Sequence, residues 1–98
     1  MSNSETECRK LILFVVGNEH NSCLARQNLS DLCKIIQVRV EIIVIDVLID
    51  FHTALKYNIL VTPALVQVNP LPTLTILGNL SHKKQVLETL GLKEEQQG

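Results

Sequence analysis

Three cysteines, Cys8, Cys23 and Cys33, are the residues of this chain best suited to covalent chemistry. Cys23 directly follows Ser22, where we predict that a helix begins, and a helix N-terminus favours the thiolate form of a cysteine. A dithiol redox cycle needs a second cysteine three residues away, and Arg26 stands there instead. The pattern therefore leaves only a one-cysteine, glutaredoxin-like mechanism for Cys23, and unpaired cysteines are more often small buried hydrophobes.

The remaining reactive side chains do not form a known catalytic or metal-binding pattern. His20, His52 and His82 are far apart, and none stands four residues from another metal-ligating side chain, so we interpret all three as solvent-exposed. Asp46 lies at the end of a predicted strand, where we expect it to accept structural hydrogen bonds. We expect no catalytic residues, no cofactor, no metal and no enzymatic activity.

The composition limits the partners and the size of the fold. The chain has 98 residues, 46% of them hydrophobic, which is enough for one domain. Nine basic residues balance ten acidic ones, so nucleic acid and membranes are not expected partners. The first residues lack the basic start and apolar run of a signal peptide, and we expect a cytoplasmic protein. We predict a disordered leader over residues 1–8, one domain over 9–92 and a mobile tail over 93–98.

The first half of the chain predicts a β-α-β unit. Residues 10–16 form a continuous apolar run that is typical of a strand covered on both faces. Apolar side chains then recur three or four residues apart from Ser22, a good N-cap, to about Ile36, which predicts an amphipathic helix. Residues 38–47 predict a second strand that starts at a rim and ends buried on both faces. A crossover helix of this kind joins parallel strands.

The second half predicts a short helix, a hairpin and a last helix. Asp50 can cap a helix that ends near Asn58 and carries one apolar stripe. Residues 64–68 and 73–77 flank a proline-rich turn and predict an antiparallel hairpin. Ser81 is the predicted cap of the last helix, and Gly91 its left-handed end. The predicted apolar stripes of these two helices are Phe51, Ala54 and Leu55, and Val86, Leu87 and Leu90.

Pro63 stands at the mouth of the predicted third strand, although a proline removes a backbone donor from a sheet. The element order β-α-β-α-β-β-α with a proline at this point resembles the thioredoxin fold, in which that proline is cis. The resemblance implies a four-stranded mixed sheet and a cis Thr62–Pro63 bond, which packing can select because cis costs only about 0.5–1 kcal/mol before proline. An ordinary trans proline in a loop is the alternative.

Residues 11–92 also resemble the KaiB family of cyanobacterial clock proteins. The resemblance is carried, in order along the chain, by Gly17-Asn18-x-x-Asn21-Ser22, Val44-Ile45-Asp46-Val47-Leu48, Ile59-Leu60-x-Thr62-Pro63, Leu71-Pro72 and Gly78-x-Leu80-Ser81. A related pattern occurs in the sensor domain of the histidine kinase SasA. The resemblance implies a non-catalytic adaptor that docks on a KaiC-type ATPase, with KaiA or a SasA-type kinase as further candidate partners.

For that docking role we predict six partner-binding residues in and near the loop before the first helix. They are Lys10, Asn18, Asn21, Ser22, Arg26 and Lys56, and we assign structural roles to Gly17, Asp46, Pro63 and Gly78. Asparagine and serine also cap helices, and single charges also solubilise, so structural roles stay open for the binding candidates. A SasA-like module that binds a kinase or response regulator is a further alternative.

KaiB proteins also adopt a second fold in which the second half of the chain is rearranged and the protein is tetrameric. Residues 59–68 are a short apolar run whose periodicity does not separate helix from strand. The β-branched residues of 61–76 favour strands, and residues 81–90 contain neither glycine nor proline. We therefore expect the thioredoxin-like form to dominate, as a monomer.

Overall fold

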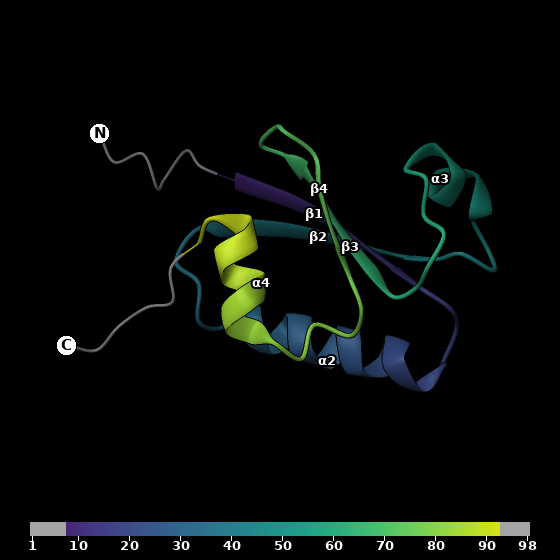
Figure 1. Ribbon diagram of the computed structural model, residues 1–98, viewed down its shortest axis with the longest axis horizontal. Helices are drawn as coiled ribbons and strands as arrows, with labels where there is room; N and C mark the ends of the chain where they lie inside the picture. The colour runs from purple at the N-terminus through teal and green to yellow at the C-terminus, as the bar shows by residue number, and fades with distance from the viewer. Residues whose placement is uncertain (1–7, 93–98) are drawn as a thin grey trace.

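A computed structural model describes residues 8–92 of the chain, and its centre is a four-stranded mixed sheet (Figure 1). The strand order is β2-β1-β3-β4, with β1 parallel to β2 and antiparallel to β3, and β3 antiparallel to β4. The strands are β1 (Cys8–Val15), β2 (Arg39–Asp46), β3 (Ala64–Asn69) and β4 (Leu74–Leu77). The predicted leader, apart from Cys8, and the predicted tail lie outside the described residues.

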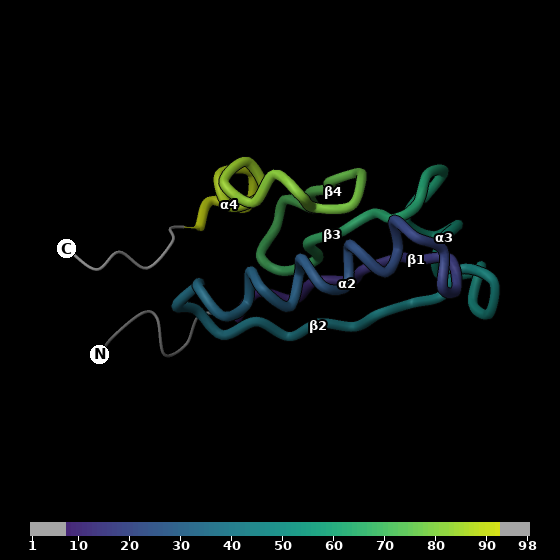
Figure 2. The backbone as a smooth tube through the Cα atoms, turned by 90° about the horizontal axis from the view of Figure 1, so that it is seen from below, coloured from purple at the N-terminus to yellow at the C-terminus, as the bar shows by residue number. Residues whose placement is uncertain are grey.

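Three helices complete the predicted order β-α-β-α-β-β-α, which is confirmed. They are α2 (His20–Cys33), α3 (Phe51–Lys56) and α4 (Lys83–Leu90). Helices α2 and α4 pack on one face of the sheet, and the two-turn helix α3 lies on the other face, toward one end (Figures 1 and 2). No helix among residues 8–92 is both long enough and apolar enough to cross a bilayer.

Alternate residues of β1 belong to two separate hydrophobic clusters, because successive side chains of a strand point to opposite faces of the sheet. Leu11, Leu13 and Val15 pack with α2 and α4 on what we call the helix-pair face. Ile12 and Phe14 pack with Ala54 of α3 and Val66 of β3 on what we call the α3 face. The predicted stripe of α4 is confirmed, since all three of its residues are buried in the helix-pair face.

The prediction that β2 ends buried on both faces is wrong. Strand β2 is an edge strand, and Ile43 and Val44 remain 43% and 48% exposed. The predicted inward stripe of α3 is also wrong for two of its members, because only Ala54 is buried while Phe51 and Leu55 face solvent. Local hydrophobicity predicted the order of the helices and strands correctly. It did not predict how deeply their side chains are buried, which depends on the strand order.

The ends of two helices differ from their predictions. Helix α2 begins at His20 with Glu19 as its N-cap, so Ser22 lies inside the first turn. Helix α4 has His82 as its N-cap, one residue after the predicted Ser81. Asp50 caps α3 as predicted and accepts hydrogen bonds from the backbone and hydroxyl of Thr53.

The connections between the elements contain the predicted cis proline and the predicted left-handed glycine. The Thr62–Pro63 bond is cis, as are the two other X–Pro bonds, which lie in the β3–β4 turn. Gly91 takes the left-handed conformation at the end of α4, with φ +70°. Pro63 is buried at the start of β3, and its carbonyl oxygen accepts a hydrogen bond of 2.9 Å from the N–H of Gly78.

Candidate functional site

Four strand ends meet at one end of the sheet, which we call the loop end. The register pairs Val15 with Asp46, Phe14 with Ala64, and Ala64 with Leu77, so β1, β2 and β4 finish where β3 begins. The loops that follow these strands, together with residues 62–63, form this end of the molecule (Figure 1). In open α/β sheets the carboxyl ends of parallel strands commonly carry the functional site.

Asp46 holds the first two loops of the loop end together. Its two carboxylate oxygens accept hydrogen bonds from the backbone N–H groups of Gly17, at 3.1 Å, and of Leu48, at 3.0 Å. Gly17 has φ +46°, a conformation that a residue with a side chain adopts only with strain. The carboxylate is therefore occupied by structural contacts, and the glycine fixes the direction of the loop.

Ser22 is fully buried beneath this loop. Its hydroxyl oxygen accepts a hydrogen bond from the N–H of Val16 at 3.0 Å, and its own N–H donates to Oε1 of Glu19 at 3.0 Å. Backbone hydrogen bonds from Asn21 and Ser22 lower the pKa of the Glu19 carboxyl below its ordinary value. Ser22 thus ties the start of α2 to the end of β1, and its buried hydroxyl is not available to a partner.

Asn18 of the loop and Asn21 and Arg26 of α2 complete this group. The guanidinium of Arg26 donates to the carbonyl oxygen of Gly17 at 3.2 Å, and Asn18 and Asn21 are exposed. Four of the six predicted binding residues therefore share the loop end: Asn18, Asn21, Ser22 and Arg26. The side-chain amides of Asn18 and Asn21 can both donate and accept hydrogen bonds, which suits recognition of a polar partner surface.

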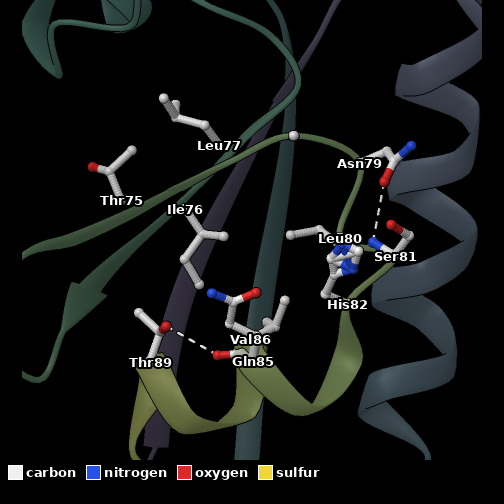
Figure 3. A pocket seen from close by; sticks show the side chains of 11 residues that line it. Thr75, Ile76, Leu77, Asn79, Leu80, Ser81, His82, Gln85, Val86 and Thr89 are labelled. Carbon is white, nitrogen blue, oxygen red and sulfur yellow. Dashed lines mark hydrogen bonds between the residues drawn. The ribbon is translucent and has the colours of Figure 1, made fainter.

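Sequence analysis missed Asn79, which joins the β4–α4 loop to this group. Its side-chain amide donates to Oδ1 of Asn21 at 3.1 Å. Its own Oδ1 accepts a hydrogen bond of 3.1 Å from the N–H of Ser81 (Figure 3). Its carbonyl oxygen accepts a bond of 2.8 Å from Asn28 of α2. In the motif Gly78-x-Leu80-Ser81 this residue is the unspecified position, and only the tertiary fold shows its contacts with α2.

The two predicted lysines lie on other elements, β1 and α3. Lys10 stands near the start of β1, five residues before the strand's end, and its Nζ lies 3.9 Å from a carboxylate oxygen of Glu41 on β2. Lys56 lies in the last turn of α3, with Nζ 5.7 Å from the centre of the Tyr57 ring. A strand rises about 3.3 Å per residue, so Lys10 is too far from the end of β1 to act together with Asn18 and Asn21.

The thiols are not arranged for a redox cycle. Cys23 is exposed, and its Sγ lies 3.6 Å from the carbonyl oxygen of Asn18. Cys33 lies at the other end of α2, where burial raises the pKa of its thiol, and Cys8 begins β1. No second thiol is near Cys23 to form a disulfide with it.

The described part of the chain, residues 8–92, contains no cluster of three metal-ligating side chains, and the three histidines are exposed.

A pocket of about 370 Å³ lies between β4 and α4, where Ile76, Leu80 and Val86 converge (Figure 3). Gly78 is the only residue from the sequence-predicted site that lines it. Asn18 and Asn21, which are exposed and lie outside this pocket, are therefore the better candidates for the functional site.

Comparisons with known proteins agree on the family and the fold. The KaiB domain family matches residues 12–92. The circadian clock oscillator protein KaiB of Synechococcus elongatus is 40% identical over 83 residues, which cover 84% of this chain and 81% of that protein. The KaiB of Thermosynechococcus vestitus is 38% identical over 89 residues, covering 90% and 82% respectively.

Two solved structures support the fold. The N-terminal domain of Synechococcus elongatus SasA matches with a TM-score of 0.71 and 26% identity, covering 94% of this chain and 89% of that domain. Chloroplastic thioredoxin z matches with a TM-score of 0.72 at 20% identity, covering 90% and 80%, a likeness that shows the fold alone. With a thioredoxin-like fold and a family match across nearly all of the described residues, this chain belongs to the KaiB family of circadian clock proteins.

Proposed function

We propose that this protein is a non-catalytic adaptor that docks on a KaiC-type ATPase and regulates a circadian clock or a clock-like stress system. The family assignment supports a clock role, and the related proteins are named as clock oscillator components. KaiA or a SasA-type kinase is a further proposed partner. The observation that carries the docking surface is the loop end, where Asp46 fixes the Gly17 loop and Asn79 joins it to the β4–α4 loop.

Within the loop end, the proposed direct contacts are Asn18 and Asn21, with Arg26 beside them. Ser22, Gly17 and Asp46 act indirectly, because their hydrogen-bonding groups already hold the loop in place. A pre-formed loop loses little conformational entropy on binding, which favours affinity. The adaptor therefore needs no reaction chemistry, only a fixed arrangement of exposed amides.

The test is binding of the full chain to the KaiC-type ATPase of the same genome. We expect Asn18→Ala with Asn21→Ala to weaken binding by about tenfold or more, which corresponds to about 1.4 kcal/mol. Gln37→Ala is the matched control, because Gln37 is an exposed amide just before β2, at the opposite end of the sheet. Equal binding of all three proteins would show that the loop end is not the docking surface.

The monothiol alternative centred on Cys23 is tested by Cys23→Ser. For an adaptor we expect unchanged binding by this variant and no thiol-transfer activity in the wild-type protein. A glutaredoxin-like transferase activity that disappears in Cys23→Ser would support the redox function instead. A kinase or response regulator bound in place of the ATPase would support the SasA-like alternative.

Regulation by rearrangement of the second half of the chain belongs to the same proposal. Amide NMR that found a helix across residues 61–68 in a minor population would support such a switch. A single set of resonances with strand character for β3 at all conditions tested would restrict this protein to the thioredoxin-like fold.

A further inference from the structure

Strand β4 forms one edge of the sheet, and among residues 8–92 it pairs only with β3. The N–H of Gly78, directly after β4, donates to the carbonyl oxygen of Pro63, directly before β3. In an antiparallel pair the backbone groups of successive residues point alternately toward the partner strand and away from it. The N–H and C=O groups of Thr75 and Leu77 therefore point outward, at the open edge of the sheet.

The side chains of β4 leave this edge accessible. The strand has the sequence Leu-Thr-Ile-Leu and contains no charged residue. Charged side chains on an edge strand hinder its pairing with further strands, and β4 lacks that protection. Thr75 and Leu77 are both exposed. The edge can therefore pair with an extended peptide, and the four residues of β4 limit the paired segment to a short one.

The pocket of about 370 Å³ lies directly beside this edge, between β4 and α4. Ile76 points toward α4 and forms the apolar part of the pocket with Leu80 and Val86, whereas Leu77 points away from it (Figure 3). Residues that lie opposite each other on paired strands have their side chains on the same face of the sheet. A peptide residue opposite Ile76 would therefore point its side chain toward the pocket.

The start of α4 gives the pocket a positive side. His82, Lys83 and Lys84 are consecutive there, and a helix N-terminus itself carries partial positive charge. The first turn of α4, which lies within the described residues, contains no acidic side chain. Lys83 contacts Asp31 at 3.4 Å, Lys84 is exposed, and Glu88 lies one turn farther along the helix. An acidic side chain of a peptide therefore gains attraction at this end of the pocket.

We propose that β4 binds an extended segment of a partner protein as a fifth, antiparallel strand of the sheet. The residue of the segment opposite Ile76 is a large aliphatic one that fills the pocket. Two residues earlier, opposite Gly78, the segment carries an acidic residue on the same face, near the start of α4. In this mode of recognition, backbone hydrogen bonds supply affinity and alternate side chains supply specificity.

The first test is a titration of the full chain with the synthetic peptide acetyl-Ser-Asp-Val-Leu-Thr-Ser-amide, followed by amide NMR. We expect saturable binding with a Kd on the order of 100 μM and the largest shifts at Thr75 and Leu77. Methylation of the peptide nitrogen of Val, which points toward β4 in this register, should weaken binding by about tenfold or more. Methylation of the Leu nitrogen, which points away, is the matched control and should have little effect.

The second test changes the protein. Thr75→Pro removes an outward N–H but no bond to β3, because a proline is tolerated at an edge position that faces solvent. It should weaken binding by about tenfold or more, and circular dichroism verifies that the variant is folded. Lys84→Glu should weaken binding several-fold. Arg39→Glu is its matched control, because Arg39 is exposed on β2 at the other edge of the sheet.

The proposal is overturned if the peptide does not bind, or if folded Thr75→Pro binds it as tightly as the wild type. Equal binding of the two methylated peptides would assign the pocket to a small apolar molecule instead. Shifts at Thr75 and Leu77 that depend on protein concentration alone would place a second copy of the chain on β4. Equal effects of the two charge changes would overturn the acidic position. Asn18 and Asn21 lie outside this pocket, so either this proposal or the proposed function can fail without the other.

Discussion

The two faces of the sheet are built from the same strands but are covered very differently. The helix-pair face is covered by α2 and α4, and its cluster contains eleven buried residues, from Leu11 to Leu90. The α3 face is covered by a two-turn helix, and its cluster contains four: Ile12, Phe14, Ala54 and Val66. Most of the large apolar side chains around α3 remain exposed. The first face therefore supplies most of the buried core, and the second leaves large apolar side chains exposed.

The largest expected effect distinguishes the two faces within one strand. Leu13 and Ile12 are neighbours on β1, and their side chains lie on the helix-pair face and the α3 face respectively. We expect Leu13→Ala to lower the free energy of unfolding by about 3–5 kcal/mol, and Ile12→Ala by about 2 kcal/mol, because a thinner cover can collapse into the cavity. Urea denaturation measures both. Equal losses would mean that the two faces contribute equally.

The second effect tests how α4 is held on the helix-pair face. Arg9 is buried, and its guanidinium donates to Oε1 of Gln67 and to the carbonyl oxygen of Leu90 at the end of α4. Arg9→Met keeps much of the side-chain volume but removes both donors. We expect a loss of about 1–3 kcal/mol in unfolding free energy, with faster amide exchange in α4.

The neighbouring residue supplies the control for this experiment. Lys10→Met removes an exposed ion pair with Glu41, which is 3.9 Å long, and should cost less than about 1 kcal/mol. If both variants lost the same stability, or if α4 exchanged no faster in Arg9→Met, the buried network would not be what fastens α4.

The differences between prediction and structure follow from the same contrast. The element order and the buried stripe of α4 were predictable because hydrophobic periodicity is local. The exposure of Ile43, Phe51 and Leu55 was not, because it depends on β2 being an edge strand and on α3 lying toward one end of its face. Apolar composition alone predicts that a residue is buried. It makes the same prediction for a sheet face covered by two helices and for one covered by a single short helix.

The candidate site shows the same limit. Ser22 and Ser81 have the residue type of helix caps, but the hydroxyl of Ser22 accepts a hydrogen bond from the N–H of Val16, directly after β1, and the N–H of Ser81 donates to Asn79. Asn79 itself contacts α2 from 51 residues farther along the chain, through Asn28. Contacts between residues so distant in sequence leave no periodic signal, so the loop asparagines could be predicted only in part.

A smaller effect concerns acid stability at the starts of α2 and α3. Hydrogen bonds from the backbone of Asn21 and Ser22 lower the pKa of Glu19, and those from the hydroxyl and then the N–H of Thr53 lower the pKa of Asp50. A lowered pKa in the folded state stabilises the fold above the ordinary values of 4.5 and 3.8, and this contribution is lost as the pH falls through the folded pKa.

Removing either charge should therefore flatten the acid limb of the stability curve. We expect Glu19→Gln and Asp50→Asn to lose less stability than the wild type between neutral and acid pH, with Glu19→Gln acting on the helix-pair face through α2. Denaturation midpoints across that pH range measure the slopes. A slope unchanged in both variants would show that these carboxyls have the same pKa in the folded and unfolded chain.

The smallest effect is expected at Leu60, which is 91% exposed in the loop between α3 and β3. Because Leu60 loses little contact with water on folding, Leu60→Ser should change the unfolding free energy by less than about 0.5 kcal/mol at low protein concentration. Leu65→Ser, in the helix-pair cluster, should lose several kcal/mol under the same conditions. Urea denaturation of both variants measures the difference. A loss at Leu60 as large as that at Leu65 would show that the loop before β3 contributes to the core as much as β3 itself does.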